Sequence, residues 1–139
     1  MSFIKTSFFV PMKPKAKGRP RFTRRGHVYT PTATRKAEEV VALYAKQVAP
    51  KQPARGPIKL VLDFCFSAPT SWPKSKRSLI VEGGDVVWHT KKPDLDNLEK
   101  LIKDSLGGIF YNDDRQVACV FKSKRYSLVD GIFITVEVM

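Results

Sequence analysis

The sequence predicts a single α+β domain, built on a mainly antiparallel mixed β-sheet with helices packed on one face. The chain has 139 residues, which is enough for one hydrophobic core and too few for two. Its 42% hydrophobic content, with 8 Gly and 10 Pro, is typical of a globular protein. The predicted strands and helices do not alternate strictly, which disfavours a parallel β/α arrangement. We therefore expect one domain spanning residues 1–139.

The N-terminal half is predicted to supply two strands and a helix. Residues 3–10 (FIKTSFFV) favour a strand that ends at a proline. Pro, Gly and cations interrupt every period in residues 12–31, so we expect a basic extended loop there. Residues 32–48 place apolar side chains at helical spacing. Residues 57–66 (PIKLVLDFCF) alternate apolar and other side chains, which predicts a second strand.

The C-terminal half is predicted to contain two helices and three strands. Residues 71–84 (SWPKSKRSLIVEGG) favour a short helix, with a hairpin through the glycine pair as the competing interpretation. Residues 94–108 (DLDNLEKLIKDSLGG) carry leucine and isoleucine on one face and end in glycines, so they form the strongest predicted helix. The predicted strands are residues 108–111 (GIFY), 115–126 (RQVACVFKSKRY) and 131–138 (GIFITVEV).

The charge of the chain predicts an anionic partner. Lys and Arg number 25 against 13 Asp and Glu, which gives a formal net charge of +12. Such an excess is typical of a nucleic-acid-binding domain, whereas a solvated basic face without a partner is the simpler alternative. The chain up to Ala37 contains ten cations and no carboxylate. The candidate DNA-binding residues are Lys15, Lys17, Arg19, Arg21, Arg24, Arg25, Lys103, Lys122 and Lys124.

Other features of the sequence bear on location and on metal or redox chemistry. No apolar run approaches the roughly 20 residues of a membrane span. The first residues (MSFIKTSFFVPMKPK) lack the order of a signal peptide, so we expect a cytoplasmic protein with no membrane partner. Cys65 and Cys119 lie far apart in apolar runs and are expected to be reduced. His27 and His89 have no partner at metal or nucleophile spacing, which disfavours a catalytic role for either.

Two acidic pairs stand near the centre of this basic chain. One lies in KKPDLDNLEK (residues 91–100) and the other in FYNDDRQV (residues 110–117). The proline before Asp94 favours an extended approach, while Asp96 falls in the first helical turn. In that geometry the two carboxylates can converge on one point. Lys100 lies one turn after Asp96 on the same side of the helix.

Several roles are open to these carboxylates. Helix capping needs only one aspartate of the first pair and leaves the second pair unexplained. A calcium loop of the EF-hand type fails, because Leu98 and Glu99 stand where a ligand and a glycine are needed. A Mg²⁺ site for phosphodiester hydrolysis agrees with the hard oxygen donors and with the basic surroundings. In that interpretation Lys100 contacts a phosphate or the charge that develops during cleavage.

The region from Lys91 to Val117 resembles the signature of the RusA family of Holliday junction resolvases. In that family K-P-D-x-D-N-L-x-K is followed by a helix and then by D-D-x-Q-V/I, and here the sequence is KKPDLDNLEKLIKDSLGGIFYNDDRQV. The upstream segments KGRPRFTRRGHVYTP and VWHTKKPDLDN resemble phage and prophage members. The likeness runs from about Pro11 to Phe121. Ser105 and Gly107 depart from the family, where Ala and Asn are frequent.

The resemblance implies a RusA-like homodimer with Mg²⁺-dependent endodeoxyribonuclease activity, with Mn²⁺ as a substitute metal and no small-molecule cofactor. It would resolve four-way junction DNA by paired symmetric nicks in recombination and repair, in the cytosol of a bacterial or phage-infected cell. The metal ligands implied by position are Asp94, Asp96 and Asp114, with Asp113 as a further member and Lys100 as the essential lysine. The alternative is a basic nucleic-acid-binding protein, binding RNA or DNA, that does not cut.

Overall fold

The computed structural model describes residues 4–82 and 86–139, which are organised around a four-stranded sheet. The strand order is β1-β6-β4-β5. β1 pairs antiparallel with β6, β6 pairs antiparallel with β4, and β4 pairs parallel with β5. The sheet is therefore mixed and mainly antiparallel, as predicted. Its strands are β1 (Lys5–Val10), β4 (Ile58–Ser67), β5 (Val117–Ser127) and β6 (Gly131–Val138).

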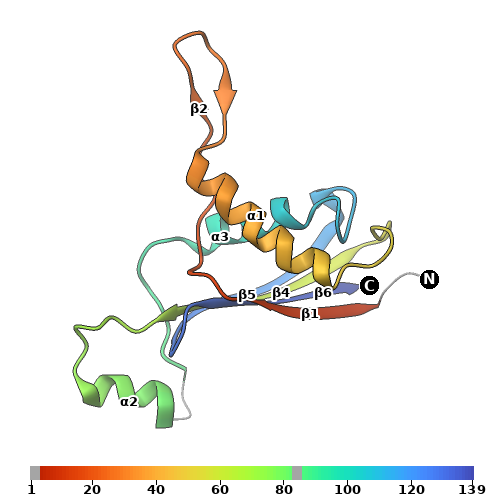
Figure 1. The fold of residues 1–139 in the computed structure, drawn as a ribbon. Coiled ribbons are helices and arrows are strands. Elements are labelled where there is room, and N and C mark those ends of the chain that lie inside the picture. The colour runs from red at the N-terminus through yellow and green to blue at the C-terminus, as the bar shows by residue number, and fades with distance from the viewer. Residues whose placement is uncertain (1–3, 83–85) are drawn as a thin grey trace.

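Two helices cover one face of this sheet, which confirms the predicted α+β architecture. α1 (Thr32–Gln47) and α3 (Leu95–Leu106) lie together above the strands in Figure 1. α2 (Lys74–Glu82) confirms the predicted short helix and lies apart from that layer, at the lower left of Figure 1. The competing hairpin through residues 83–84 lies outside the described residues. Across residues 4–82 and 86–139, no helix combines the length and apolar character needed to cross a membrane.

The core lies between the sheet and the α1–α3 layer, where the predicted apolar faces meet. Each fully buried aliphatic or aromatic side chain contributes roughly 1.5–3 kcal/mol through its removal from water. Cys65 is buried and Cys119 half-buried, and both are free thiols. The main core residues of β4, α1 and α3 are Ile58, Leu60, Leu62, Phe64, Ala37, Val41, Ala45, Leu98, Leu101, Ile102 and Leu106.

The basic segment 12–31 carries more structure than the extended loop that we expected. β2 (Arg21–Phe22) and β3 (Val28–Tyr29) form an antiparallel hairpin within it. The turn contains Gly26 with φ +80°, a backbone conformation that favours glycine. The hairpin projects from the body of the protein beyond the N-terminal end of α1 (Figure 1). It has no apolar alternation because it packs no core, and so the periodicity did not predict it.

The predicted strand at residues 108–111 is wrong. This segment instead turns around the C-terminal end of α3, starting from Gly108 with φ +84°. Phe110 and Tyr111 are fully buried there, and the carbonyl of Phe110 accepts a hydrogen bond from the Ala54 amide at 2.9 Å. The apolar run that suggested a strand therefore fills the core beneath the helix end.

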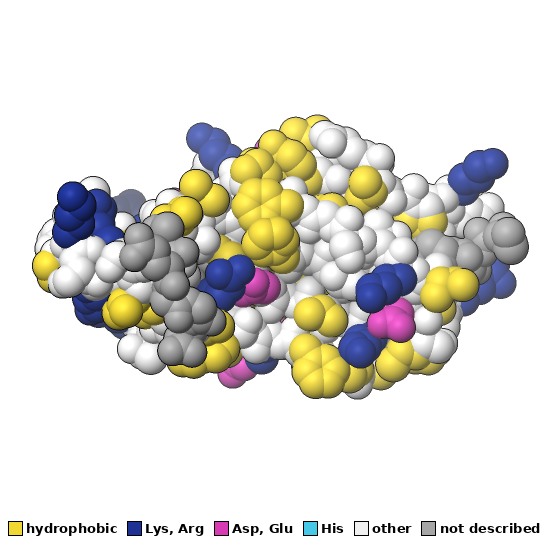
Figure 2. Space-filling model, turned by 90° about the horizontal axis from the view of Figure 1, so that it is seen from below, with side chains coloured by type: hydrophobic (Ala, Val, Ile, Leu, Met, Phe, Trp, Pro, Cys, Tyr) yellow, Lys and Arg dark blue, Asp and Glu magenta, His cyan; other side chains and the backbone are white. Residues whose placement is uncertain are grey.

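The other face of the sheet is not covered by α1 or α3. Val61, Phe121 and Phe133 are exposed on its strands. Arg125 and Asp63 form an ion pair across the same face, with 2.9 Å between Nη2 and Oδ2. Figure 2, which views the molecule from below, shows hydrophobic side chains in separate groups, with charged side chains between them.

Candidate active site

The first acidic pair begins α3 and is open to solvent. Asp94 occupies the position before the helix with φ −72° and ψ 148°, and Asp96 lies in the first turn. This confirms the predicted extended approach followed by a helical start. The Asp94 side chain makes no capping hydrogen bond, and the Asp96 side chain is 92% exposed. Helix capping therefore does not explain why Asp94 is a carboxylate.

A lysine from β5 lies beside this pair. The ammonium group of Lys122 is 3.0 Å from Oδ1 of Asp96 and 2.9 Å from Oε1 of Glu99. Burial would lower the pKa of Lys122, but its bonds to Glu99 and Asp96 raise it. Burial would likewise raise the pKa of Glu99, but hydrogen bonds from Lys122 and Lys103 lower it. A protein cation thus already pairs with Asp96 and Glu99 in the first turns of α3.

Lys100 lies along the same helix and keeps its ammonium group accessible. Its side chain is 58% exposed, and its Nζ is 3.9 Å from Oδ2 of Asp104. Asp104 is also 3.2 Å from Nζ of Lys17, which pairs with Glu38 of α1 at the same distance. Lys17 was predicted to bind DNA, and in the fold it links the basic segment to α1 and α3. Lys100 therefore has fewer and longer ion-pair contacts than Lys17.

The second acidic pair lies in a tightly bonded turn. Asp113 precedes a short 3-10 helix, η1 (Asp114–Gln116), and its Oδ1 accepts a hydrogen bond from the Arg115 amide at 2.8 Å. This backbone bond and the Arg115 side chain lower the pKa of Asp113. Asp113 therefore has a capping role. Its role as a metal ligand stays a prediction.

Gln116 fixes this turn to the segment that leads into β4. Its Oε1 accepts hydrogen bonds from the amides of Asn112 at 2.8 Å and Asp113 at 3.0 Å. Its Nε2 donates to the carbonyls of Ala54 at 2.8 Å and Gly56 at 3.0 Å. The Asp113–Gln116 pair forms a complete capping box. The glutamine of the motif thus has a structural explanation.

Asp114 lies near the other end of α3 from the first pair. Its negative charge influences the Tyr111 hydroxyl. That hydroxyl donates a hydrogen bond to the Lys103 carbonyl at 2.7 Å. Burial raises the pKa of Tyr111, and the charges of Asp114 and Asp104 raise it further. Eight residues separate Asp96 from Asp104, about 12 Å along a helix. Within the described parts of the chain, no three His, Cys, Asp or Glu side chains gather closely enough to hold a metal ion.

The cations predicted to bind DNA fall into two groups. Those of the basic segment are exposed, apart from Lys17, and the exposed rings of Phe22 (72%) and Tyr29 (47%) accompany them. These rings do not anchor the segment to the core. The lysines near α3 have internal partners: Lys103 pairs with Glu99, Lys122 with Asp96 and Glu99, and Lys124 donates to the carbonyls of Lys91 and Pro93. The exposed group is Lys15, Arg19, Arg21, Arg24 and Arg25.

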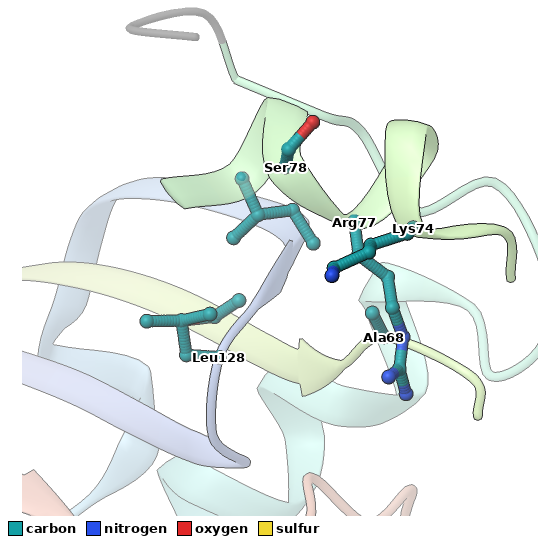
Figure 3. Close-up of a pocket in the computed structure, with 7 residues that line it drawn as sticks. Ala68, Lys74, Arg77, Ser78 and Leu128 are labelled. Carbon is teal, nitrogen blue, oxygen red and sulfur yellow. The ribbon is translucent and has the colours of Figure 1, made fainter. Parts of the chain in front are cut away.

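A separate cleft of about 390 Å³ lies beside α2. Figure 3 shows Leu128 across from Lys74 and Arg77 of α2, with Ala68 beside the Arg77 side chain. Arg77 donates to the Pro69 carbonyl at 3.4 Å, and among side chains of residues 4–80 and 86–139 no carboxylate lines this cleft. None of its described lining residues belongs to the acidic pairs.

Comparison with known proteins shows the family of this chain. The sequence pattern described as Endodeoxyribonuclease RusA matches residues 11–137. The chain belongs to the RusA endodeoxyribonuclease family. The matched RusA region contains both acidic pairs, the basic hairpin and the helices α1, α2 and α3. A protein of Bacillus subtilis (strain 168), "Uncharacterized protein YqaN", is 34% identical over 123 residues, which are 86% of this chain and 87% of that relative.

Some residues of this RusA-family site were not assigned there from the sequence. Glu99 was named only as a residue that disagrees with an EF-hand loop, although it lies four residues before Lys103, a spacing that favours ion pairs. Asp104 lies four residues after Lys100 and pairs with it in the same way. Tyr111 carried no such signal, because its contact with the α3 backbone arises only from the turn that follows the helix.

Proposed function

We propose that this protein is a divalent-metal-dependent endonuclease that resolves four-way DNA junctions by paired symmetric nicks, in recombination and repair. One observation carries the proposal: the RusA family match extends over residues 11–137 and includes a helix start with two exposed aspartates. The formal charge of +12 suits a polyanionic substrate. Such an enzyme would meet its substrate in the cytoplasm of a bacterial or phage-infected cell.

We propose Asp94, Asp96 and Asp114 as the metal ligands. The donor chemistry fits Mg²⁺, with Mn²⁺ as a substitute, because Mg²⁺ prefers hard oxygen ligands and needs only a few carboxylates beside its retained waters. Asp94 supports this assignment because no capping bond occupies its side chain. When bound, the ion would activate water and stabilise negative charge on the phosphate. Lys100, exposed one turn beyond Asp96, would contact the reacting phosphate.

We propose that the active form is a homodimer whose two copies share each metal site. In one chain Asp114 and Asp104 both act on Tyr111, and Asp104 lies about 12 Å along α3 from Asp96. The partner's Asp114 would then complete the ligand set at Asp94 and Asp96. A two-fold dimer also matches a substrate cut at two symmetric positions.

We propose that the exposed cations of the hairpin hold the arms of the junction. Arg21, Arg24 and Arg25 project with the hairpin beyond α1 and would contact backbone phosphates. Phe22 and Tyr29 offer exposed rings on which an unpaired base can stack. Lys103, Lys122 and Lys124 remain candidates for a second DNA contact once substrate competes with their internal partners.

Incubation of the purified protein with a synthetic four-way junction tests the proposed function. We expect symmetric nicks in opposing strands when Mg²⁺ or Mn²⁺ is present, and no nicks with chelator. A linear duplex of the same sequences serves as the control for structure selectivity. If no nicking occurs across several divalent metals and junction sequences while the junction is still bound, the protein is a binding module and the proposed activity is wrong.

A further inference from the structure

A cleft lined by lysines opens next to the first acidic pair. Its volume is about 700 Å³, and it is bounded by residues 13–16, by residues 91–93 and by the ends of β4 and β5. Four exposed lysines line it: Lys13, Lys15, Lys91 and Lys92. We refer to it as the lysine cleft.

The four lysines carry charge that the described part of the protein does not neutralise. Neighbouring lysines are engaged, since Lys17 pairs with two carboxylates and Lys124 donates to two carbonyls. None of the four forms an ion pair with a carboxylate of residues 4–80 or 86–139. Asp130, the only carboxylate on the cleft wall among those residues, accepts a hydrogen bond from the Ser67 amide at 2.8 Å. Four like charges around one hollow repel one another, and a bound anion would relieve that repulsion.

The floor of the lysine cleft is a packed aromatic cluster. The rings of His89 and Phe66 stack with centroids 4.0 Å apart, and the ring of Tyr126 lies 4.9 Å from His89. Burial lowers the pKa of His89, and the charges of Lys124, Lys91 and Lys13 lower it further. Its buried Nδ1 has no hydrogen-bond partner among the described residues. A buried nitrogen without a partner costs stability, so stability alone does not account for this arrangement.

The cleft is held in a fixed relation to the first acidic pair. Residues 91–93 form one wall and lead directly into Asp94. The ammonium group of Lys124 donates to the carbonyls of Lys91 and Pro93, each at 2.7 Å. These bonds tie the wall to β5, the strand that also supplies Lys122 to Asp96. An anion in the cleft would therefore have a defined position relative to the carboxylates.

We propose that the lysine cleft binds a backbone phosphate of the DNA strand that runs into the site at Asp94 and Asp96. This inference rests on the proposed function. The phosphate lies one or a few nucleotides from the cleaved bond, and its ligands are the ammonium groups of Lys13, Lys15, Lys91 and Lys92. The contact positions the strand along the groove and carries no base specificity. The aromatic floor is almost fully buried, so the site takes phosphate rather than a stacked base.

The first test removes two charges from the wall formed by residues 13–16, which is far in sequence from Asp94 and Asp96. The double variant Lys13→Gln/Lys15→Gln is titrated with the junction in chelator, so that binding is measured without cleavage. We expect affinity to fall on the order of tenfold, because one set of charged hydrogen bonds is lost. The slope of log affinity against log salt should become shallower by about 0.9, the value for one phosphate. The matched control is Lys46→Gln/Lys51→Gln, which removes two exposed lysines from the end of α1 and the segment after it.

The second test locates the phosphate on the DNA. Single methylphosphonates, which are uncharged, are placed at successive positions on either side of the cut site. One position should weaken binding by the unmodified protein on the order of tenfold and weaken binding by Lys13→Gln/Lys15→Gln clearly less, since that variant keeps only Lys91 and Lys92. Additive losses at every position, or a double variant that binds like the control variant, would overturn the proposal. Binding of inorganic phosphate at the lysines without any sensitive DNA position would also overturn it, since the ligand would then be a free anion.

The outcomes separate this inference from the proposed function. A protein that binds junctions and shows the methylphosphonate effect without cutting retains the lysine cleft and loses the endonuclease assignment. A protein that nicks junctions normally after loss of Lys13 and Lys15, with unchanged affinity, retains the endonuclease assignment and loses the lysine cleft. Circular dichroism of each variant shows whether the fold is kept.

Discussion

The two acidic pairs look alike in the sequence and differ in how the fold holds them. Asp94 and Asp96 start a helix without capping it, and a lysine from a distant strand contacts Asp96 at 3.0 Å. Asp113 belongs to a local network in which its own carboxylate and the Gln116 amide satisfy backbone groups of the turn. Asp96 is thus held by an ion pair and Asp113 by hydrogen bonds within its own turn.

This difference distinguishes the first pair, whose carboxylates could accept a cation, from Asp113, whose carboxylate accepts a hydrogen bond from the backbone of its turn. Replacing Lys122 by a metal ion at Asp96 exchanges one cation for another and requires no backbone change. Asp113 would have to share its carboxylate with the Arg115 amide. We therefore expect the first pair to tolerate little change in charge and Asp113 to tolerate loss of charge if its hydrogen bonding is kept.

The strongest test exchanges Asp for Asn in each pair. Asp96→Asn should reduce junction nicking on the order of 10³-fold, because a ligand charge is lost where the phosphate reacts. Junction binding should be unchanged or tighter, since one negative charge leaves a surface that faces a polyanion. Asp113→Asn keeps an oxygen for the cap and should reduce nicking less than about tenfold. Single-turnover nicking and fluorescence anisotropy measure the two effects. Equal losses in both variants would contradict the distinction between the pairs.

Removal of Gln116 tests the claim that the second pair depends on local hydrogen bonds. Gln116→Ala leaves two amides and two carbonyls without their partner and should lower the free energy of unfolding by about 2–3 kcal/mol. Arg115→Ala is the control, because that side chain is 87% exposed and its ion pair with Asp113 lies in solvent, where such a pair contributes little. Urea denaturation followed by circular dichroism measures both. A loss with Gln116→Ala no larger than with the control would show that the turn is held by its packing.

Much of the fold was predictable because most of it follows simple periodicity. The alternation in β4 and β6 and the leucine face of α3 each describe one buried face, and the structure buries those faces. The predicted strand at residues 108–111 was wrong for a physical reason. A short apolar run is equally compatible with a strand and with a turn that fills the core. The β2–β3 hairpin was missed for the opposite reason. Its residues are exposed and pack no core, so the sequence there shows no apolar periodicity.

The site was predictable as far as its residues are neighbours along the chain. The extended approach at Asp94 follows from Pro93, and the helical position of Asp96 follows from the leucine spacing. The contact between Lys122 and Asp96 joins residues 26 positions apart and depends on how β5 lies against α3. Likewise, the lysine cleft brings residues 13–16 to residues 91–93. Such contacts between distant segments have no signal in a single sequence.

Lys122→Gln tests whether a protein cation and a metal ion compete for Asp96. Removal of this charge should lower the Mg²⁺ concentration for half-maximal nicking by about three- to tenfold, because a repulsive charge a few ångströms away is lost. Stabilisation by Mg²⁺, measured as a shift in melting temperature without DNA, should increase as well. Lys59→Gln is the control, since Lys59 is also a strand lysine and forms an ion pair of 4.0 Å with Glu137 of β6. An unchanged or higher Mg²⁺ requirement would mean that Lys122 does not compete with the metal.

The smallest expected effect concerns the pH dependence of stability near the first pair. The hydrogen bonds from Lys122 and Lys103 outweigh the effect of burial and hold the pKa of Glu99 below its ordinary value of 4.5. A lowered pKa means that the folded state releases this proton more readily than the unfolded state. The stabilisation is therefore complete above about pH 4.5 and is lost as the pH falls through the lowered value.

Glu99→Gln should remove this dependence. We expect the variant to be less stable than the unmodified protein at neutral pH by at most about 1 kcal/mol, and the difference should shrink as the pH falls below 4.5. Urea denaturation over a pH series measures it, with Glu39→Gln as the control, because Glu39 is exposed on α1 and forms no ion pair with the described residues. A difference that stays constant with pH would mean that Glu99 acts through packing. The lysines beside the first pair would then have no measurable stabilising contact with Glu99.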